Sequence, residues 1–182
     1  MPRRDAEAFT AFASARSAAL HRAAYLMVGD THLAQDLVQE ALTKTYMAWP
    51  NLRDQNAAEA YTRRVITNTA ITWFRRKRWR NELPTETLPD APTGSPEDAQ
   101  AAVSLIWAAL MKLPTRQRAA VVLRYYEDLT IAQTAEVLGC SIGTVKSQVS
   151  VALLKLRNQL GEDADLSLFD HLDATTNGAM IR

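Results

Sequence analysis

The chain of 182 residues has few of the residues that build disulfide frameworks, metal sites and membrane spans. Its one cysteine, Cys140, excludes a disulfide within the chain and favours a reducing compartment. The three histidines and the carboxylates show no spacing typical of a metal site or an acid–base pair. No apolar run approaches the roughly 20 residues of a membrane span, and the opening MPRRDAEAF lacks the apolar core of a signal peptide. We therefore expect a soluble, cytoplasmic, non-enzymatic protein without a metal ion or cofactor.

A net charge of one sign is also missing. The 21 Lys and Arg residues nearly balance the 20 Asp and Glu residues, so the overall charge does not indicate a nucleic-acid-binding protein. The charges are instead segregated along the chain. Residues 61–80 contain seven basic residues and no acid, whereas residues 82–98 contain five acids and no base. The basic stretch is typical of a nucleic-acid surface, or else of a solvated helix end, and the acidic stretch is typical of a linker.

Strand patterns are nearly absent, because apolar residues recur at intervals of three and four along most of the chain. The pattern predicts helices over 5–28, 31–49, 57–80, 97–112, 115–126, 131–138 and 142–160. Four of the seven prolines lie between residues 82 and 98. The predicted fold class is therefore all-α, with two small helical domains joined by a flexible, acidic, proline-rich linker. The predicted parts are residues 1–82, a linker over 83–98, residues 99–161 and an acidic tail over 162–182.

The stretch TIAQTAEVLGCSIGTVKSQV predicts a helix-turn-helix. Thr130 can cap the first helix, with Gln133 as its capping-box partner. Gly139 suits a helix end that needs a positive φ, and Ala135 and Val145 suit the buried positions between the helices. The second helix begins with small and polar residues, and that end of such a helix enters the major groove. The residues that we expect near DNA are Ser141, Thr144, Lys146, Ser147 and Gln148.

The helix predicted over 57–80, capped by Asn56 with Glu59, has two distinct stripes. The first is predicted to be core and comprises Tyr61, Val65, Thr69 and Trp73. The second is cationic and comprises Arg64, Asn68, Thr72, Arg75 or Arg76, and Trp79. Arginine neutralises phosphates, asparagine can read an adenine edge and aromatic rings stack on unpaired bases. The second stripe therefore predicts binding to nucleic acid.

The helix predicted over 31–49 has a different polar face. Its core stripe comprises Leu33, Leu37, Ala41 and Trp49, widened by Val38 and Leu42. Its other face comprises Asp36, Gln39 or Glu40, Thr43 and Met47. Acidic and amide groups do not suit DNA, but they suit a protein partner with complementary Arg or Lys residues. The alternative is an ordinary solvated face.

Together these segments resemble the extracytoplasmic-function group (group 4) of RNA polymerase sigma factors. DLVQEAL, from Asp36 to Leu42, is similar to the group's D-x-x-Q-E-x-F motif for core polymerase, with Leu42 in place of Phe. AYTRRVITNTAITWFRRKRWR is similar to its −10 helix, and residues 113–157 are similar to its −35-binding domain. The sequence around TRRVITNT, RRKRWRNELP and YEDLT resembles that of a subgroup common in actinobacteria. The resemblance covers residues 6–160 or thereabouts, with three motifs in the expected order.

The resemblance implies a sigma factor that binds core RNA polymerase, through its largest and second-largest subunits, and promoter DNA. It also implies a possible anti-sigma protein as a partner, and no insertion into a membrane. The implied polymerase-binding residues are Asp36, Gln39, Glu40 and Thr43. The loop over 51–56 is the implied pocket for a flipped base of the −10 element. The implied −10 residues are Asn56, Arg64, Asn68, Arg75, Arg76, Arg78 and Trp79. The −35 residues are those predicted above for the helix-turn-helix.

Two positions depart from the group's pattern. Val151 stands where Arg is usual, which predicts the loss of about one phosphate contact. The tail carries five acids and one base, with Leu166, Phe169 and Leu172 at intervals of three. It is either a frayed terminus or a short amphipathic segment that covers a basic DNA-binding face or meets a regulator. The alternative function is a self-contained helix-turn-helix regulator that binds operator DNA as a dimer without polymerase.

Overall fold

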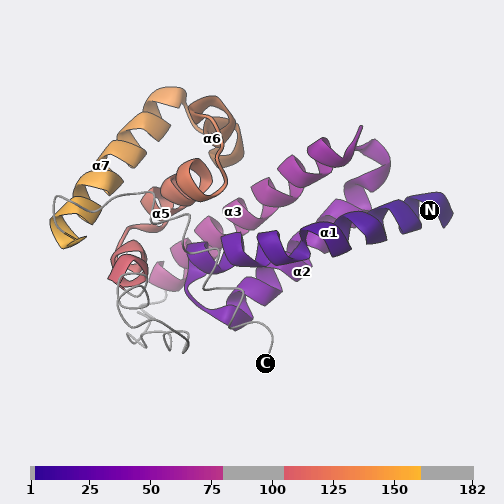
Figure 1. Cartoon of the computed structure of the whole chain (residues 1–182), viewed down its shortest axis with the longest axis horizontal. Coiled ribbons are helices and arrows are strands. Elements are labelled where there is room, and N and C mark those ends of the chain that lie inside the picture. The colour runs from indigo at the N-terminus through magenta and orange to yellow at the C-terminus, as the bar shows by residue number, and fades with distance from the viewer. Residues whose placement is uncertain (1–2, 80–104, 161–182) are drawn as a thin grey trace, which may run out of the picture. The chain divides into compact units, whose positions relative to one another are not determined.

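The computed structural model in Figure 1 describes residues 3–79 and 105–160, with side chains over 6–76 and 105–160. All regular structure in these ranges is helical, which confirms the predicted all-α class. The chain divides into two compact units, Met1–Arg76 and Lys77–Arg182, which are treated separately below. The predicted linker over 83–98, the tail over 162–182 and the start of the helix predicted over 97–112 lie outside the described residues.

The first unit comprises three helices and one short 3-10 turn. They are α1 (Arg3–Val28), α2 (Thr31–Ala48), the 3-10 turn η1 (Trp49–Asn51) and α3 (Gln55–Trp79). α1 ends at Val28, and the next residue is Gly29, as predicted, whose φ of 79° only glycine adopts easily. α2 begins after Asp30, whose side chain accepts a hydrogen bond from the backbone N–H of Leu33 at 2.9 Å.

The core of this unit contains three buried threonines as well as apolar side chains. The Thr45 and Thr62 hydroxyls lie 2.8 Å apart and join α2 to α3, and Thr67 donates to the Met27 sulfur on α1. Each hydroxyl has a single proton to donate, and the carbonyl four residues earlier in its own helix is a second acceptor within hydrogen-bond distance. Hydrogen bonds therefore compensate for burying these polar groups.

The predicted core stripe of α3 is wrong by one residue. The side chains buried at intervals of four are Ala58, Thr62, Ile66 and Ala70, whereas Tyr61, Val65, Thr69 and Trp73 only border the core. Ala58 and Ala70 at the two ends of the buried stripe let neighbouring helices approach closely, whereas the bulky Tyr61 and Trp73 lie at its border. On α2 the prediction is nearer: Leu37, Val38 and Ala41 are buried, while Leu33, Leu42 and Trp49 are half-buried.

Beyond the end of α3, the described part of the second unit comprises a helix over residues 105–111, α5 (Thr115–Val121), η2 (Val122–Tyr126), α6 (Ile131–Leu138) and α7 (Ile142–Leu160). The helix predicted over 115–126 changes at Val122 to π-helical geometry. Arg118 is buried and donates to the Met111 carbonyl at 3.3 Å, which satisfies an acceptor at the end of the preceding helix. Burial lowers the pKa of Arg118 to about 10.

A further hydrogen bond, from Lys155 Nζ to Gln117 Oε1 at 3.0 Å, joins α7 to α5. In the described part of the chain, no single helix is long and apolar enough to cross a membrane. The pair α6 and α7 passes that test only jointly, by length and composition, and bends by 101° at its turn. That angle is the one expected of a helix-turn-helix.

Candidate functional site

The turn between α6 and α7 has the geometry that its sequence predicts. Thr130 Oγ1 accepts from the Gln133 backbone N–H, and the Gln133 side chain accepts from the Thr130 N–H, which completes the capping box. Gly139 is left-handed, with φ 61° and ψ 43°. Ser141 Oγ accepts from the Thr144 N–H at 3.1 Å, and Ala135 and Val145 are buried. The prediction of a helix-turn-helix is confirmed.

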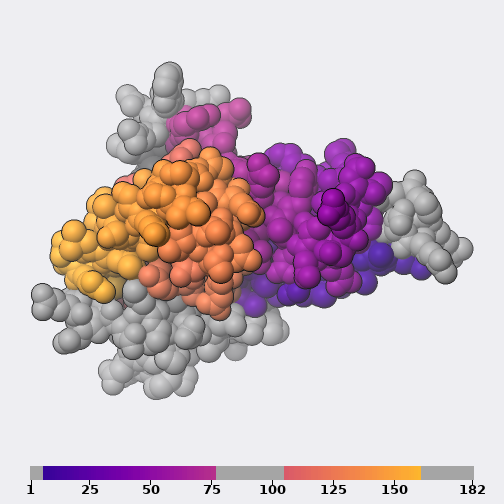
Figure 2. All heavy atoms as spheres, turned by 90° about the horizontal axis from the view of Figure 1, so that it is seen from above, coloured from indigo at the N-terminus to yellow at the C-terminus, as the bar shows by residue number. Residues whose placement is uncertain are grey.

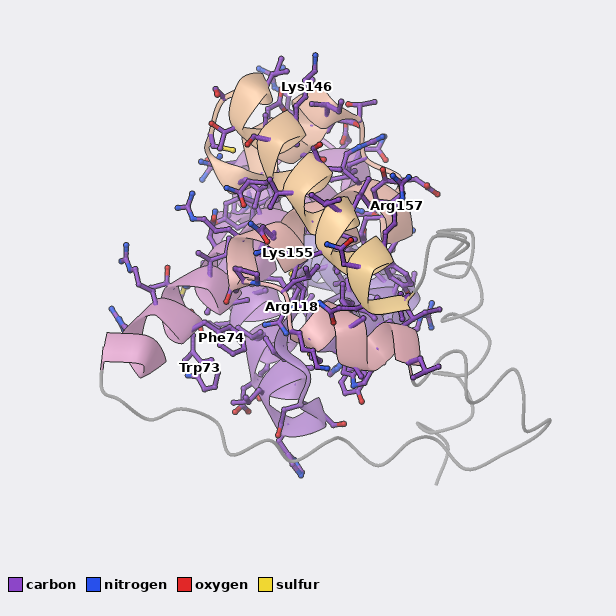
Figure 3. All side chains as sticks on the ribbon, turned by 90° about the vertical axis from the view of Figure 1, so that its left-hand side faces the viewer. Trp73, Phe74, Arg118, Lys146, Lys155 and Arg157 are labelled. Atoms are coloured by element: carbon purple, nitrogen blue, oxygen red, sulfur yellow. The ribbon has the colours of Figure 1, made fainter. Side chains whose placement is uncertain are left out.

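The residues predicted to meet DNA in this unit lie at the start of α7, whose surface runs from orange to yellow in Figure 2. Ser141, Lys146 and Ser147 are exposed, while Thr144 and Gln148 are half-buried. The Ser141 and Thr144 hydroxyls lie 2.9 Å apart, so each already has a partner within the turn. α7 contains three basic residues (Lys146, Lys155 and Arg157) and no acid, and Figure 3 labels all three. This composition suits a polyanion.

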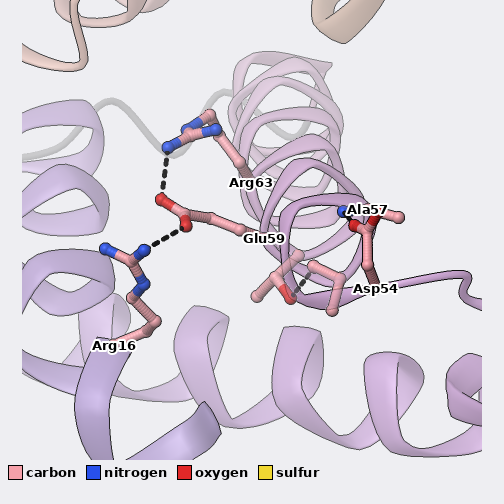
Figure 4. Close-up of polar contacts among 7 residues, drawn as sticks. Arg16, Asp54, Ala57, Glu59 and Arg63 are labelled. Atoms are coloured by element: carbon pink, nitrogen blue, oxygen red, sulfur yellow. Dashed lines mark hydrogen bonds and ion pairs between the residues drawn. The ribbon is translucent and has the colours of Figure 1, made fainter.

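The basic face of α3 is divided by an ion pair. Glu59 bonds to Arg63 within α3 and to Arg16 on α1, each at 2.9 Å, as Figure 4 shows. Arg64 is exposed and makes no ion pair among the described residues. Arg63 thus stabilises the packing of α3 on α1, whereas Arg64 presents its charge to solvent.

The remaining predicted residues of α3 lie along the same helix. Asn68, Arg75 and Arg76 are exposed, and the side chains of Arg78 and Trp79 lie outside the described range. Trp73 and Phe74, both labelled in Figure 3, are half-buried and meet edge to face with their centroids 5.0 Å apart. This aromatic pair lies beside Arg75 at the border of the core, whereas the sequence pattern predicts that Trp73 is buried.

The start of α3 corrects a prediction. The cap is Asp54, whose carboxylate accepts from the Ala57 N–H at 2.8 Å (Figure 4), rather than Asn56. Asp54 immediately precedes α3, and its side chain accepts from the backbone N–H of the third helical residue, which is the N-cap geometry. Asn56 is exposed in the first turn. Because its side chain is not needed as the cap, Asn56 stays a candidate for contact with DNA.

The four residues predicted to bind polymerase do lie together on α2. They surround a surface hollow of about 450 Å³. Its lining is Asp36, Gln39, Glu40, Thr43, Lys44 and Met47. The Glu40 carboxylate is paired with Lys44 at 2.6 Å, whereas Asp36 makes no ion pair among the described residues. Asp36 therefore presents the less compensated negative charge of the two.

Two members of this hollow are not among the four predicted polymerase-binding residues, although the sequence pattern placed Met47 on the same face. Met47 is 75% exposed, which is unusual for a large apolar side chain and is typical of a surface that binds a partner. Lys44 lies four residues after Glu40, so the i, i+4 pairing could have been read from the sequence. Met47 likewise follows Glu40 and Thr43 on one helical stripe.

A second hollow, of about 470 Å³, adjoins the first and shares Gln39 and Thr43 with it. It lies between α1 and α2. Its other lining residues are Phe9, Ser17, His21, Gln35, Val38, Leu42 and Tyr46. Phe9 and Tyr46 meet edge to face at 5.0 Å, and burial lowers the pKa of His21. The polymerase-binding candidates thus stand at the edge of a mainly apolar groove.

Comparisons with known proteins agree with this arrangement. Residues 12–80 match the family model of sigma-70 region 2, and residues 104–156 match that of sigma-70 region 4. The chain is 41% identical to the RNA polymerase sigma-E factor of Streptomyces coelicolor, over 84% of this chain and 85% of that protein. It is 33% identical to the ECF sigma factor SigM of Mycobacterium tuberculosis, over 78% of this chain and 71% of SigM.

Among solved structures, the sigma factor RpoE of Bartonella quintana, in complex with the anti-sigma factor NepR, superposes with a TM-score of 0.71. It is 25% identical in sequence, and the match covers 86% of this chain and 99% of RpoE. The two domain matches, in this order, and the similar proteins indicate the same family. The chain belongs to the sigma-70 family as an extracytoplasmic-function RNA polymerase sigma factor, a transcription initiation factor that binds core polymerase and promoter DNA.

Proposed function

We propose that this sigma factor acts in the cytoplasm, catalyses no reaction itself, and divides its work among three helices. Residues 1–82 bind core polymerase and the −10 element, residues 83–98 connect the parts, and residues 99–161 bind the −35 element. Nucleotide transfer belongs to the polymerase. The observation that carries this proposal is that one unit presents a negative, partly apolar face on α2 and a positive face on α3.

The α2 face is proposed to dock on the largest polymerase subunit. Asp36 supplies the principal charge for a complementary Arg or Lys, while Gln39 and Thr43 supply polar contacts at the edge of the apolar groove. Glu40 contributes less than Asp36, because Lys44 already neutralises part of its charge. Met47 adds apolar contact area at the end of the same hollow.

The α3 face is proposed to hold the non-template strand of the −10 element. The exposed Arg64, Arg75 and Arg76 can neutralise phosphates, and Asn68 can read a base edge between them. Asn56 stands at the loop proposed to receive a flipped base. Arg78 and Trp79 would extend this surface.

The start of α7 is proposed to enter the major groove of the −35 element. Lys146 and Ser147 are its exposed groups, with Thr144 and Gln148 beside them. Val151 follows one turn later and supplies no phosphate contact, so the salt dependence of binding should be lower by about one counterion than with arginine there. A protein inhibitor is a further partner, as NepR is for the Bartonella relative.

The experiment is a binding assay between the whole chain and core RNA polymerase, comparing Asp36→Arg, Glu40→Arg and Glu7→Arg. All three replacements change the net charge equally, but the exposed Glu7 lies on α1 outside both hollows. We expect Asp36→Arg to weaken binding by about tenfold or more, roughly 1.4 kcal/mol. Glu40→Arg should weaken it less, and Glu7→Arg should leave it unchanged.

Equal losses in all three variants would show that net charge alone matters and would contradict docking on α2. No binding by the wild-type chain, with DNA binding intact, would favour the alternative of a self-contained regulator that binds operator DNA as a dimer. The predicted order of the three variants distinguishes a defined interface from general electrostatic attraction.

A further inference from the structure

α7 carries an exposed apolar pair on the side that faces away from the core. Val151 is 39% exposed and Leu154 is 58% exposed, whereas Val145, Ala152 and Leu156 are buried on the opposite side of the helix. Val151 and Leu154 are three residues apart and so share one face. Ser147, one turn earlier, continues that face toward the proposed DNA-reading end. An apolar pair contributes little to binding phosphates, so this part of α7 suits another occupant.

Positive charges flank the apolar pair. Figure 3 shows Lys155 and Arg157 labelled on opposite sides of α7. α7 contains no acidic residue that could neutralise either charge. Lys155 Nζ donates one hydrogen bond to Gln117 and has further donors, while Arg157 is exposed. An occupant of this face should therefore combine apolar side chains with carboxylates.

The chain itself contains such a segment directly after α7. Residues 161–182 have five acids and one base, and Leu166, Phe169 and Leu172 recur at intervals of three. Leu154 lies six residues before the end of α7, which is about 9 Å along the helix, and Val151 about 14 Å. Residues 161–165, if extended, span about 17 Å, so Leu166 can return to either position.

We propose that residues 162–173 dock back onto the Val151–Leu154 face of α7, with their carboxylates beside Lys155 and Arg157, and so compete with DNA. The inference rests on the proposed function of α7 and adds its regulation. A short tether gives the tail an effective concentration of about 1 mM at this face. If the dissociation constant of the contact is about 0.2 mM, the docked state is about five times as populated as the undocked state. DNA affinity should then be about sixfold lower than in a chain whose tail cannot dock.

The first test locates the tail. A nitroxide is attached to Ala174→Cys in a Cys140→Ser background of the full chain, and its broadening of methyl NMR signals is measured. We expect strong broadening at Val151 and Leu154, and Leu105, which is 62% exposed on the helix over 105–111, serves as the comparison outside α7. Replacing Leu166, Phe169 and Leu172 by serine should abolish the broadening. Uniform or absent broadening in the starting chain would overturn the proposal.

A mixed sample tests the other occupants. Isotope-labelled chain without nitroxide is combined with nitroxide-bearing chain without isotopes. Broadening of Val151 and Leu154 in this mixture would assign the face to a second copy and overturn docking within one chain. If the mixture shows no broadening, and a chain that carries both the isotopes and the nitroxide does show it, the proposal is supported.

The second test measures affinity for a DNA duplex of arbitrary sequence at low salt. The triple serine variant of the tail should bind about sixfold more tightly than the wild type, whereas Leu105→Ser should bind equally well. Equal affinity of the tail variant and the wild type would overturn competition with DNA. Polymerase is absent from these assays, so failure here is distinct from failure of the polymerase interface. Loss of DNA binding in every chain would count against the function proposed for α7, while the NMR result still decides docking.

Discussion

Two glycines four residues apart, Gly139 and Gly143, should respond to the same substitution with opposite signs. Gly139 has φ 61°, and a Cβ built there meets nothing within 4 Å. Alanine at 139 therefore meets no steric clash, and its cost comes from the left-handed backbone alone, roughly 1–2 kcal/mol. A stiffer unfolded chain offsets about 0.4–1 kcal/mol of this. We expect Gly139→Ala to lower the free energy of unfolding of the second unit by about 1 kcal/mol.

At Gly143 the backbone is that of an ordinary helix, and a Cβ would lie 3.7 Å from Ser141 Oγ, a normal van der Waals distance. Alanine there loses less conformational entropy on folding than glycine and gains helix propensity. Because the position is in the first turn of α7, we expect Gly143→Ala to raise the free energy of unfolding by about 0.5 kcal/mol.

Hydrogen exchange followed by mass spectrometry is the appropriate assay, because it assigns unfolding to peptides of the second unit alone. The slowest amides of α6 and α7 should exchange about fivefold faster in Gly139→Ala and about twofold slower in Gly143→Ala. Gly139→Asn should fall between wild type and Gly139→Ala, since asparagine tolerates the left-handed region. Effects of the same sign for the two alanine variants would refute the reasoning. So would a loss above about 3 kcal/mol at Gly139, which requires a steric clash.

Two further substitutions test the first unit. Thr45→Val should lower the free energy of unfolding of the first unit by about 1 kcal/mol in denaturant titration. The loss is small because the Thr62 hydroxyl, without Thr45, can still donate to the Ala58 carbonyl. A loss above about 3 kcal/mol would contradict this. Burial lowers the pKa of His21 below its ordinary 6.5. The unfolded chain therefore binds more protons, and stability should fall as the pH falls through this region. His21→Asn should flatten that slope in thermal unfolding from pH 7 to 5, and an unchanged slope would contradict the assignment.

The features that were predicted correctly are local ones. The capping box of Thr130 and Gln133 involves atoms within four residues, and so does the left-handed turn at Gly139. The same holds for the end of α1 at Gly29. Short-range geometry and the steric freedom of glycine determine these features whatever packs around them. The grouping of Asp36, Gln39, Glu40 and Thr43 on one face likewise follows from helical periodicity alone.

The errors concern choices between nearby positions. Periodicity and residue size selected Tyr61 and Trp73 for the core of α3, but close packing buried the stripe of Ala58 and Ile66 instead. The helix also began at Gln55, because Asp54 caps it where Asn56 was expected to. Either side chain can cap a helix, and the path of the chain from η1 into α3 decided between them.

The sequence by itself determined that this protein is helical throughout its described parts, where its helix-turn-helix lies, and which residues can share a face. These follow from periodicity and from hydrogen bonds between near neighbours. Only the tertiary structure decided which charges are already paired. Glu59 joins Arg63 to Arg16 from another helix, so Arg64, and not its neighbour, presents its charge to solvent. It also brought α1 beside α2 to form the apolar groove, because side chains distant in sequence meet only when helices pack.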